Sequence, residues 1–246
     1  MNNKPTAIVT GAAKGIGWTI SNRLAADGYF IVAVDMDRDG GAALESHLGA
    51  ENMEYRKMNI ASEEDVKALF AEVKSTRGKV DAVVNNAGII RDNMIWNMTA
   101  DDFDAVVNVN LKGTWLMCRE AAIVMREQKA GKIVNIASRA WLGNRGQSNY
   151  APSKAGVVAL TRVLALELGK YNVCVNAVAP GLIDTPLTQK LEKGVLQKLI
   201  DAQPTRTMGL PEDVANVVSF LVAGTTQFVT GQTIYVDGGK SIGANM

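Results

Sequence analysis

The sequence predicts an α/β fold, in which a doubly wound parallel sheet of about seven strands is flanked by helices on both faces. Strand-like apolar runs alternate along the chain with segments of helical period. These runs are continuously apolar, which indicates that both faces of the sheet are covered. The first run leads through a glycine-rich turn into a helix, so the architecture is of Rossmann type. Clear strands are expected at 6–10, 30–34, 82–85, 132–136, 173–178 and 233–236.

The segments between the strands have the apolar periodicity of helices. One stripe at i, i+3, i+4 and i+7 consists of Val66, Leu69, Phe70 and Val73. Ser62, before an acidic first turn, is expected to cap this helix. A second stripe consists of Val157, Leu160, Thr161, Leu164 and Leu168. Pro211 opens a further helix, because proline is tolerated in the first turn.

Length and composition favour one soluble domain over residues 1–246. The chain has 47% apolar residues, and no repeat, linker or low-complexity tract divides it. Its 26 Lys and Arg against 25 Asp and Glu leave no basic excess for a nucleic acid or a membrane surface. No apolar run reaches membrane-spanning length and no apolar leader is visible, so a cytoplasmic protein is expected.

The residues that could bind metals give no support to metal chemistry. Cys118 and Cys174 are the two cysteines, and we expect both to be buried, reduced thiols. His47, the single histidine, is expected at the surface. No metal site is therefore predicted. The longest stretch without a clear strand suggests a substrate lid at about 182–205, helical in part.

The turn after the first strand has the spacing G-x-x-x-G-x-G, with Gly11, Gly15 and Gly17. Such glycines let the backbone approach a pyrophosphate at a helix N-terminus, although an isolated glycine cluster can also be an ordinary turn. Asp35 ends the second strand, 24 residues after Gly11, where a carboxylate can meet the adenosine ribose hydroxyls or simply be solvated. NAD is therefore favoured, whereas Lys14 and Arg38 would favour NADP.

These features, together with three further motifs, resemble the short-chain dehydrogenase/reductase family from Thr6 to Gly239. The motifs are Asn85-Asn86-Ala87-Gly88 after the fourth strand, Tyr150-x-x-x-Lys154, and Pro180-Gly181. Residues 86–93 and 231–239 are most similar to those of 3-oxoacyl-thioester reductases in this family, a similarity shared with many bacterial alcohol dehydrogenases.

Tyr150 and Lys154 lie four residues apart in a segment of helical period, so they share one face. A lysine ammonium beside a phenol is expected to lower the tyrosine pKa and make Tyr150 a general acid/base. Ser138 ends the fifth strand, twelve residues before Tyr150, and the resemblance implies that it binds the substrate oxygen. Asn110 matches the family's fourth catalytic residue, which positions a water near Lys154.

The resemblance also implies the cofactor contacts. Lys154 would hold the nicotinamide ribose, and Thr185 would contact the carboxamide. Asn59 stands where the family commonly has an Asp that binds the adenine amino group, and its amide oxygen can still accept that bond. The full expected set is Gly11, Lys14, Gly15, Ile16, Gly17, Asp35, Asn59, Ile60, Asn86, Ala87, Gly88, Tyr150, Lys154, Pro180, Gly181, Ile183 and Thr185.

Ser138, Arg139, Trp141 and Tyr150 are the expected substrate contacts. Trp141 would favour an apolar or ring-bearing group, unless it is a packing or interface residue. Four basic residues either meet a carboxylate or the phosphates of a coenzyme A thioester, or form a solvated face. They are Arg139, Arg145, Lys190 and Lys193.

We expect an oxidoreductase that transfers a hydride between NAD(H) and a secondary alcohol or ketone. The substrate would be a 3-hydroxyacyl or 3-oxoacyl thioester, or a cyclic or aromatic secondary alcohol. The alternatives are an NADPH-dependent 3-oxoacyl-thioester reductase and a non-catalytic dinucleotide-binding subunit; the four intact catalytic residues argue against the latter. The resemblance further implies a homotetramer packed through helices at about 102–128 and 148–170.

Overall fold

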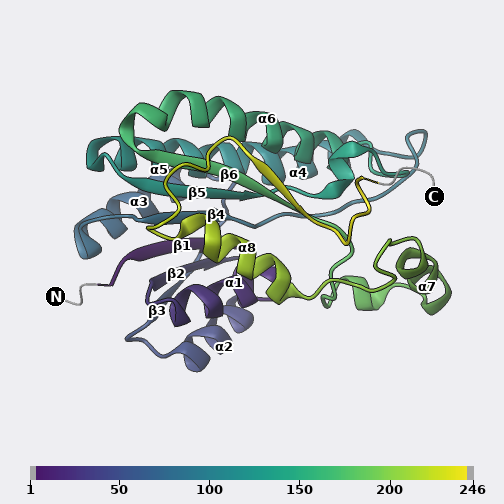
Figure 1. Ribbon diagram of the computed structural model, residues 1–246, viewed down its shortest axis with the longest axis horizontal. Helices are drawn as coiled ribbons and strands as arrows, with labels where there is room; N and C mark the ends of the chain where they lie inside the picture. Colours follow the sequence, from purple (N-terminus) through teal and green to yellow (C-terminus); the bar gives the residue numbers. More distant parts are fainter. Residues whose placement is uncertain (1–3, 243–246) are drawn as a thin grey trace.

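The computed structural model describes residues 4–242, which build one seven-stranded parallel sheet in the order β3-β2-β1-β4-β5-β6-β7 (Figure 1). The predicted fold class is confirmed. Chain order reverses beside β1, which pairs with both β2 and β4, and ligands of such sheets bind in the crevice at this point. The strands are β1 (Thr6–Thr10), β2 (Phe30–Asp35), β3 (Met53–Lys57), β4 (Ala82–Asn85), β5 (Gly131–Ile136), β6 (Val173–Pro180) and β7 (Thr233–Val236).

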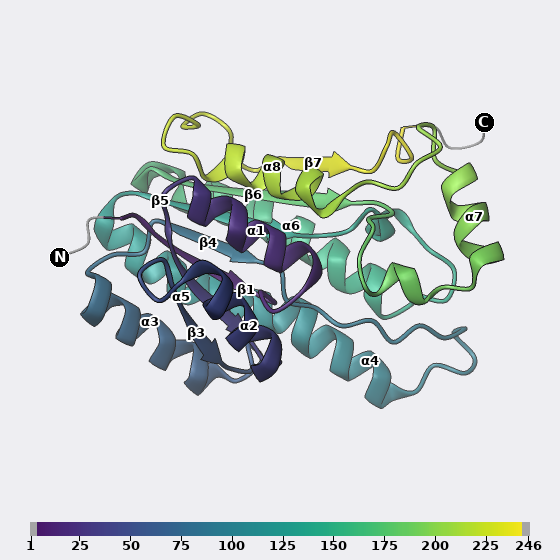
Figure 2. The same cartoon turned by 90° about the horizontal axis from the view of Figure 1, so that it is seen from below.

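Helices cover both faces of the sheet, as Figures 1 and 2 show. One face packs against α1 (Gly15–Ala26), α2 (Arg38–Leu48) and α8 (Pro211–Val222). The other packs against α3 (Glu63–Arg77), α5 (Thr114–Gln128) and α6 (Tyr150–Leu168). Successive strand residues point to opposite faces, so both apolar layers draw on the same strands. In β1, for example, Ile8 belongs to one layer, and Ala7 and Val9 belong to the other.

The helix expected at 102–128 is interrupted by a wider turn. It consists of α4 (Ala100–Val107), a six-residue π-helix (Asn108–Gly113) and α5. A π-helical turn inside an α-helix is rare and often lies at a functional site. Sequence periodicity does not reveal it, because the extra residue shifts the apolar stripe by only part of a turn.

Local predictions for the helices agree with the structure. The Val66, Leu69, Phe70 and Val73 stripe is buried, and the Ser62 hydroxyl accepts the N–H of Asp65 at 3.3 Å. Pro211 is the first residue of α8. His47 is exposed on α2 and lies 5.7 Å from the Trp18 ring. β3 was not located by its own pattern, because Met-Glu-Tyr-Arg-Lys is a largely polar, half-exposed edge strand.

The segment at 182–205 contains a short 3-10 helix (Thr188–Lys190) and α7 (Lys193–Asp201). Figures 1 and 2 show α7 away from the sheet, beyond the carboxyl ends of its strands. No residue of α7 is buried. The helical content expected of this segment is therefore present, and its role as a lid stays a prediction.

Both cysteines are buried and unpaired with each other, and burial raises the pKa of the Cys118 thiol to about 12. Within residues 4–242, no group of three or more His, Cys, Asp and Glu residues is arranged to hold a metal ion. None of the helices in the described part has the length and hydropathy needed to span a lipid bilayer.

Candidate active site

The site lies where β1, β4, β5 and β6 end. The loop between β1 and α1 needs glycine at three positions. Gly11 and Gly15 have φ values of 66° and 56°, in the left-handed region. A Cβ on Gly17 would lie 2.0 Å from the Gly11 carbonyl oxygen. Ile16, between Gly15 and Gly17, packs at the edge of the α1/α8 layer. This compact loop leaves the α1 N-terminus open to an anionic group.

The turn after β4 holds the glycine loop in place. The Asn86 amide nitrogen donates to the carbonyl oxygens of Thr10 and Gly11, both at 3.0 Å. In return, the Thr10 hydroxyl accepts the N–H groups of Asn86 and Ala87, also at 3.0 Å. A Cβ on Gly11 would meet the Ala87 Cα at 2.8 Å, so the two backbones are in direct contact. The two predicted motifs thus form one unit.

Asp35, at the end of β2, faces the glycine loop. Its carboxylate accepts the N–H groups of Ala13 and Asp37, both at 3.0 Å. Lys14 lies 3.1 Å from the Asp37 carboxylate. The bond from the Gly40 N–H, followed by the Lys14 ammonium, lowers the pKa of Asp37 below its usual range. The cation that could have met a 2′-phosphate is therefore already paired with a carboxylate.

Sequence reasoning missed Asp37 and Tyr55. Asp37 also caps α2 through the Gly40 N–H. The Tyr55 hydroxyl donates to the carbonyl oxygens of Asp35 and Asp37 at 2.9 and 3.0 Å, and so fixes the turn that presents the Asp35 carboxylate. Tyr55 comes from β3, an edge strand whose pairing is visible only in the fold.

Asn59 and Ile60 follow β3 and lie on the same side as Asp35. Asn59 is exposed, and its side-chain oxygen accepts the N–H of Ala61 at 3.0 Å. Ile60 is buried, and a Cβ on Gly113 would lie 2.9 Å from its side chain. Ile60 therefore connects this edge of the crevice to the end of the π-helix.

Tyr150 begins α6, and Lys154 lies one turn later on the same face. The Lys154 Nζ is 5.8 Å from the Tyr150 ring centre. Lys154 is buried, and its Nζ donates to the Ile136 carbonyl oxygen at 2.7 Å, which anchors α6 to the end of β5. Burial lowers the pKa of Lys154 to about 8.

Ser138 follows β5 and caps a 3-10 helix (Arg139–Leu142), its hydroxyl accepting the N–H of Ala140 at 3.1 Å. Burial raises the pKa of Tyr150, a hydrogen bond with Ser138 lowers it, and the Asp92 carboxylate raises it. The sequence predicted a lowered pKa for this tyrosine. That prediction is wrong for the isolated chain, because desolvation of the phenolate outweighs the bond to Ser138.

Asn110, the third residue of the π-helix, is fully buried. Its side-chain oxygen accepts the N–H of Ile89 at 2.8 Å, and its amide donates to the Ile89 carbonyl oxygen at 3.0 Å and to the Ser153 hydroxyl at 3.2 Å. A Cβ on Gly88 would lie 3.2 Å from the Asn110 oxygen and 3.5 Å from the Lys154 Nζ. The fold therefore brings Asn110, Gly88 and Lys154 together.

The segment after β6 crosses in front of the glycine loop. Gly181, after Pro180 at the end of β6, donates its N–H to the Val236 carbonyl oxygen at 2.9 Å. Ile183 is buried and pairs with Gly209. The Thr185 methyl group would lie 3.7 Å from a Cβ on Gly15. These expected cofactor residues thus lie on the opposite side of the crevice from Asp35.

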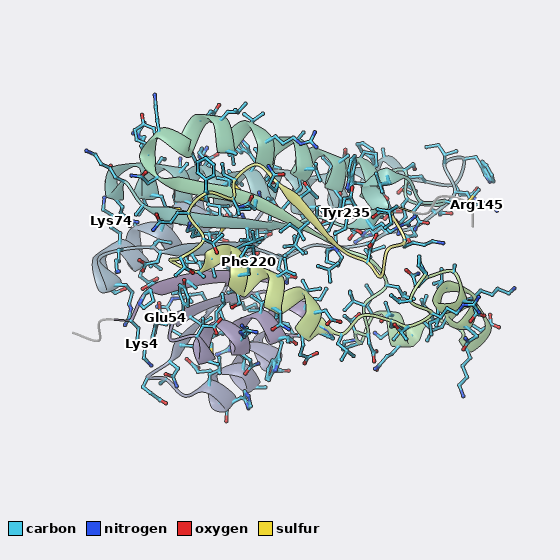
Figure 3. The ribbon with its side chains drawn as sticks, in the orientation of Figure 1. Lys4, Glu54, Lys74, Arg145, Phe220 and Tyr235 are labelled. Carbon is cyan, nitrogen blue, oxygen red and sulfur yellow. The ribbon has the colours of Figure 1, made fainter. Side chains whose placement is uncertain are left out.

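The residues expected to meet the substrate or its carrier divide into partly buried ones, Trp141 and Arg139, and exposed ones. Trp141 packs against the cluster formed by Ala137, residues of α6 and residues of β6, as the packing interpretation requires, although its indole nitrogen is buried without a hydrogen-bond partner. Arg139 is half-buried. Figure 3 shows Arg145 at the periphery, and Lys190 and Lys193 are exposed.

Two loops that flank the site are tied together by polar residues that sequence reasoning missed. The Gln147 amide donates to the Asp92 carboxylate at 2.9 Å, and the Asn149 amide donates to the Arg91 carbonyl oxygen at 2.8 Å. Asn93 donates its N–H to Gly146 at 2.9 Å. These contacts join residues more than fifty positions apart, so no local signal could have found them.

Comparison with known proteins gives consistent matches over nearly the whole chain. A family model described as enoyl-(acyl carrier protein) reductase matches residues 11–241. The chain is 41% identical, over 96% of each sequence, to the (2S)-[(R)-hydroxy(phenyl)methyl]succinyl-CoA dehydrogenase subunit BbsD of Thauera aromatica. It is 39% identical to the 3-oxoacyl-[acyl-carrier-protein] reductase FabG of Thermotoga maritima, over 96% of this chain and 97% of that one. The crystal structure of levodione reductase superposes with a TM-score of 0.93 at 32% identity, covering 98% of both chains.

Proposed function

Because this chain belongs to the short-chain dehydrogenase/reductase family of oxidoreductases, we propose that it transfers a hydride between NAD(H) and the carbinol carbon of a 3-hydroxyacyl thioester or its 3-oxo form. One observation carries the proposal. Ser138, Tyr150, Lys154 and Asn110 converge at the ends of β4 and β5, next to a glycine loop built for a dinucleotide.

The residues present fit a nicotinamide dinucleotide. The loop from Gly11 to Gly17 brings backbone N–H groups and the α1 N-terminus to one point, where a pyrophosphate is stabilised. Asp35 presents a carboxylate at the neighbouring strand end, which suits ribose hydroxyls. When bound, the nicotinamide gives or accepts the hydride, and its oxidised form brings a positive charge to the site.

NAD is favoured over NADP by charge. The Asp35 carboxylate would repel a 2′-phosphate, and Lys14 is paired with Asp37. Arg38 forms no ion pair with any residue in the 4–242 range, and this observation favours the alternative, an NADPH-dependent 3-oxoacyl-thioester reductase.

In the proposed mechanism the substrate oxygen binds between the Ser138 hydroxyl and the Tyr150 phenol. Tyr150, protonated at neutral pH because burial raises its pKa, donates its proton to a carbonyl oxygen during reduction. In oxidation the phenolate takes the proton of the alcohol. Lys154 stabilises that phenolate, and a pKa of about 8 lets it exchange protons near working pH. Asn110 would hold the water that returns protons to Lys154.

The substrate class follows from the relatives. One is a dehydrogenase of a hydroxy(phenyl)methyl succinyl-CoA and another a reductase of 3-oxoacyl carrier-protein thioesters. Both names describe a hydroxy or oxo group on the acyl part of a thioester. The same class is proposed here, with cyclic and aromatic secondary alcohols next, since levodione reductase has the same fold.

The test measures nicotinamide absorbance while the purified chain meets NAD⁺ or NADP⁺ and a panel of 3-hydroxyacyl thioesters and aliphatic, cyclic and aromatic secondary alcohols. Turnover of the thioesters with NAD⁺ supports the proposal. Preference for NADP⁺ would favour the alternative cofactor. Measurable NADH binding without turnover of any compound would contradict it.

The assembly we propose is a homotetramer packed through α5 and α6. A groove of about 470 Å³ lies between these helices. Its lining includes Trp115 and Ile123, which are 43% and 44% exposed, and the small Ala122. The lining also includes the charged Arg119, Arg126, Glu167 and Lys170. A groove that combines apolar and charged side chains on one face suits packing against a second copy.

A further inference from the structure

Unpaired polar atoms concentrate in the segment between Ser138 and Tyr150. Eight buried side-chain nitrogen or oxygen atoms in the described part of the chain have no hydrogen-bond partner, and four of them belong to this segment. They are the Arg139 Nε, the Trp141 Nε1, the Gln147 Oε1 and the Ser148 Oγ. These atoms are closed off from solvent, so they do not themselves line an open pocket; they show that the segment joining Ser138 to Tyr150 has unused hydrogen-bonding capacity.

Arg139 is the charged member of this cluster. Across residues 4–242, only Arg77 and Arg139 have a buried guanidinium nitrogen without a partner. The Arg77 guanidinium lies over the Phe30 ring at 3.6 Å, whereas Arg139 has neither an aromatic ring nor a carboxylate within contact distance among these residues. The Asp92 carboxylate, on the neighbouring loop, is already bound by Gln147.

We propose that Arg139 binds a carboxylate that the substrate carries close to its reacting carbonyl, and thereby selects acyl thioesters with a second, anionic end. The inference rests on the proposed function of the site. Arg139 directly follows Ser138, with its Cα about 3.8 Å away. A guanidinium pairs with a carboxylate through two parallel hydrogen bonds, which a solvated ammonium does not match.

The position of Arg139 favours an acyl carboxylate over the phosphates of a carrier. The phosphates of coenzyme A or of a carrier protein lie at the far end of the pantetheine arm. Arg139 instead directly follows, in the chain, Ser138, the residue proposed to bind the reacting oxygen. Arg145, which lies at the periphery in Figure 3, and the exposed Lys190 and Lys193 are better placed for phosphates.

The experiment uses three 3-oxoacyl thioesters: binding is measured with the complex of the full chain and NAD⁺, which cannot reduce them, and turnover is measured with NADH. Two are N-acetylcysteamine thioesters of equal length, one ending in a methyl group and one in a carboxylate. The third is the coenzyme A thioester of the methyl-ended acid. Calorimetry gives their dissociation constants and nicotinamide absorbance gives turnover, for the natural chain and for Arg139→Met, Arg139→Lys and the control Arg145→Met.

We expect Arg139→Met to weaken binding of the carboxylate-ended probe by about ten- to a hundredfold and to change the methyl-ended probe less than about twofold. Arg139→Lys should recover part of the loss, and Arg145→Met should bind both phosphate-free N-acetylcysteamine probes as the natural chain does. The inference is overturned if Arg139→Met leaves the binding of both N-acetylcysteamine probes unchanged or weakens the binding of both equally. If Arg139→Met weakens the binding of the coenzyme A thioester alone, the inference is overturned, and Arg139 recognises the phosphates instead.

Failure of the proposed function has a different outcome. If the carboxylate-ended probe binds through Arg139 but neither N-acetylcysteamine thioester is reduced, the carboxylate site stands and thioester reduction is wrong. If both are reduced without dependence on Arg139, thioester reduction stands and the carboxylate site is wrong. If neither N-acetylcysteamine thioester binds or reacts, both are wrong.

Discussion

At the scale of single residues, the site depends on two ionisable groups with shifted pKa values. Burial raises the pKa of Tyr150 and lowers that of Lys154 to about 8. Both shifts favour the neutral form, because a charge is poorly solvated at this depth. A neutral phenol next to a readily titrated amine suits a step in which one proton moves.

Tyr150→Phe removes the phenol but keeps the ring. We expect kcat to fall by roughly a hundred- to ten-thousandfold, as general acid/base catalysis is lost. The dissociation constant of NADH should change less than about twofold, since the ring still packs. The control Tyr171→Phe removes a hydroxyl in the α5/α6 groove and should keep full activity. Unchanged turnover of Tyr150→Phe would refute its assigned role.

Lys154 should also leave a signature in stability. Below pH 8 both the folded and the unfolded chain hold its proton; between pH 8 and 10.5 only the unfolded chain does. The unfolded state then binds more protons, so the free energy of unfolding rises with pH across this window, by up to about 3 kcal/mol. Denaturant titrations should lose this rise in Lys154→Met and keep it in the exposed control Lys112→Met.

We expect the preference for NAD⁺ over NADP⁺ to depend mainly on one residue, Asp35. Asp35→Ser removes the carboxylate that would repel a 2′-phosphate, so kcat/KM for NADP⁺ relative to NAD⁺ should rise at least about tenfold. Asp39→Ser makes the same change of charge in the exposed first turn of α2 and should leave the ratio nearly unchanged. An equal response of both variants would assign the preference to net charge instead of to Asp35.

At the scale of elements, the β1–α1 loop has the least tolerance for change. A Cβ at Gly17 would lie 2.0 Å from the Gly11 carbonyl oxygen, so the loop would have to move. We expect Gly17→Ala to weaken NADH binding at least about tenfold, measured by fluorescence titration. Gly169→Ala, where a Cβ meets nothing within 4 Å, is the matched control. Similar NADH affinity in the two variants would show that the loop adapts.

The π-helix is the element that the sequence did not predict. Its wide turn carries Asn110, which bonds both backbone groups of Ile89 and so holds the Gly88–Ile89 turn beside Lys154. Asn110 is identifiable in the sequence through the family motif, and its buried amide needs hydrogen-bond partners. Its partners come from another loop, so only folding could identify them.

At the scale of the whole molecule, the groove between α5 and α6 is the surface that we expect a second copy to cover. Ile123→Glu replaces an exposed apolar side chain of this groove by a charge and should shift the sedimentation coefficient toward that of a smaller species. Ile95→Glu, on the exposed loop before α4, should sediment like the natural chain. If the natural chain is monomeric at all concentrations tested, the proposed assembly is wrong.

The sequence by itself determined the parallel sheet, the glycine loop and the pairing of Tyr150 with Lys154. These features depend on apolar period, on backbone conformations that only glycine adopts readily and on helical spacing, all of which are local. The tertiary structure alone decided the raised pKa of Tyr150, the pairing of Lys14 with Asp37 and the unpaired state of Arg139. Burial and charge environment depend on residues distant in sequence, and only folding brings these together.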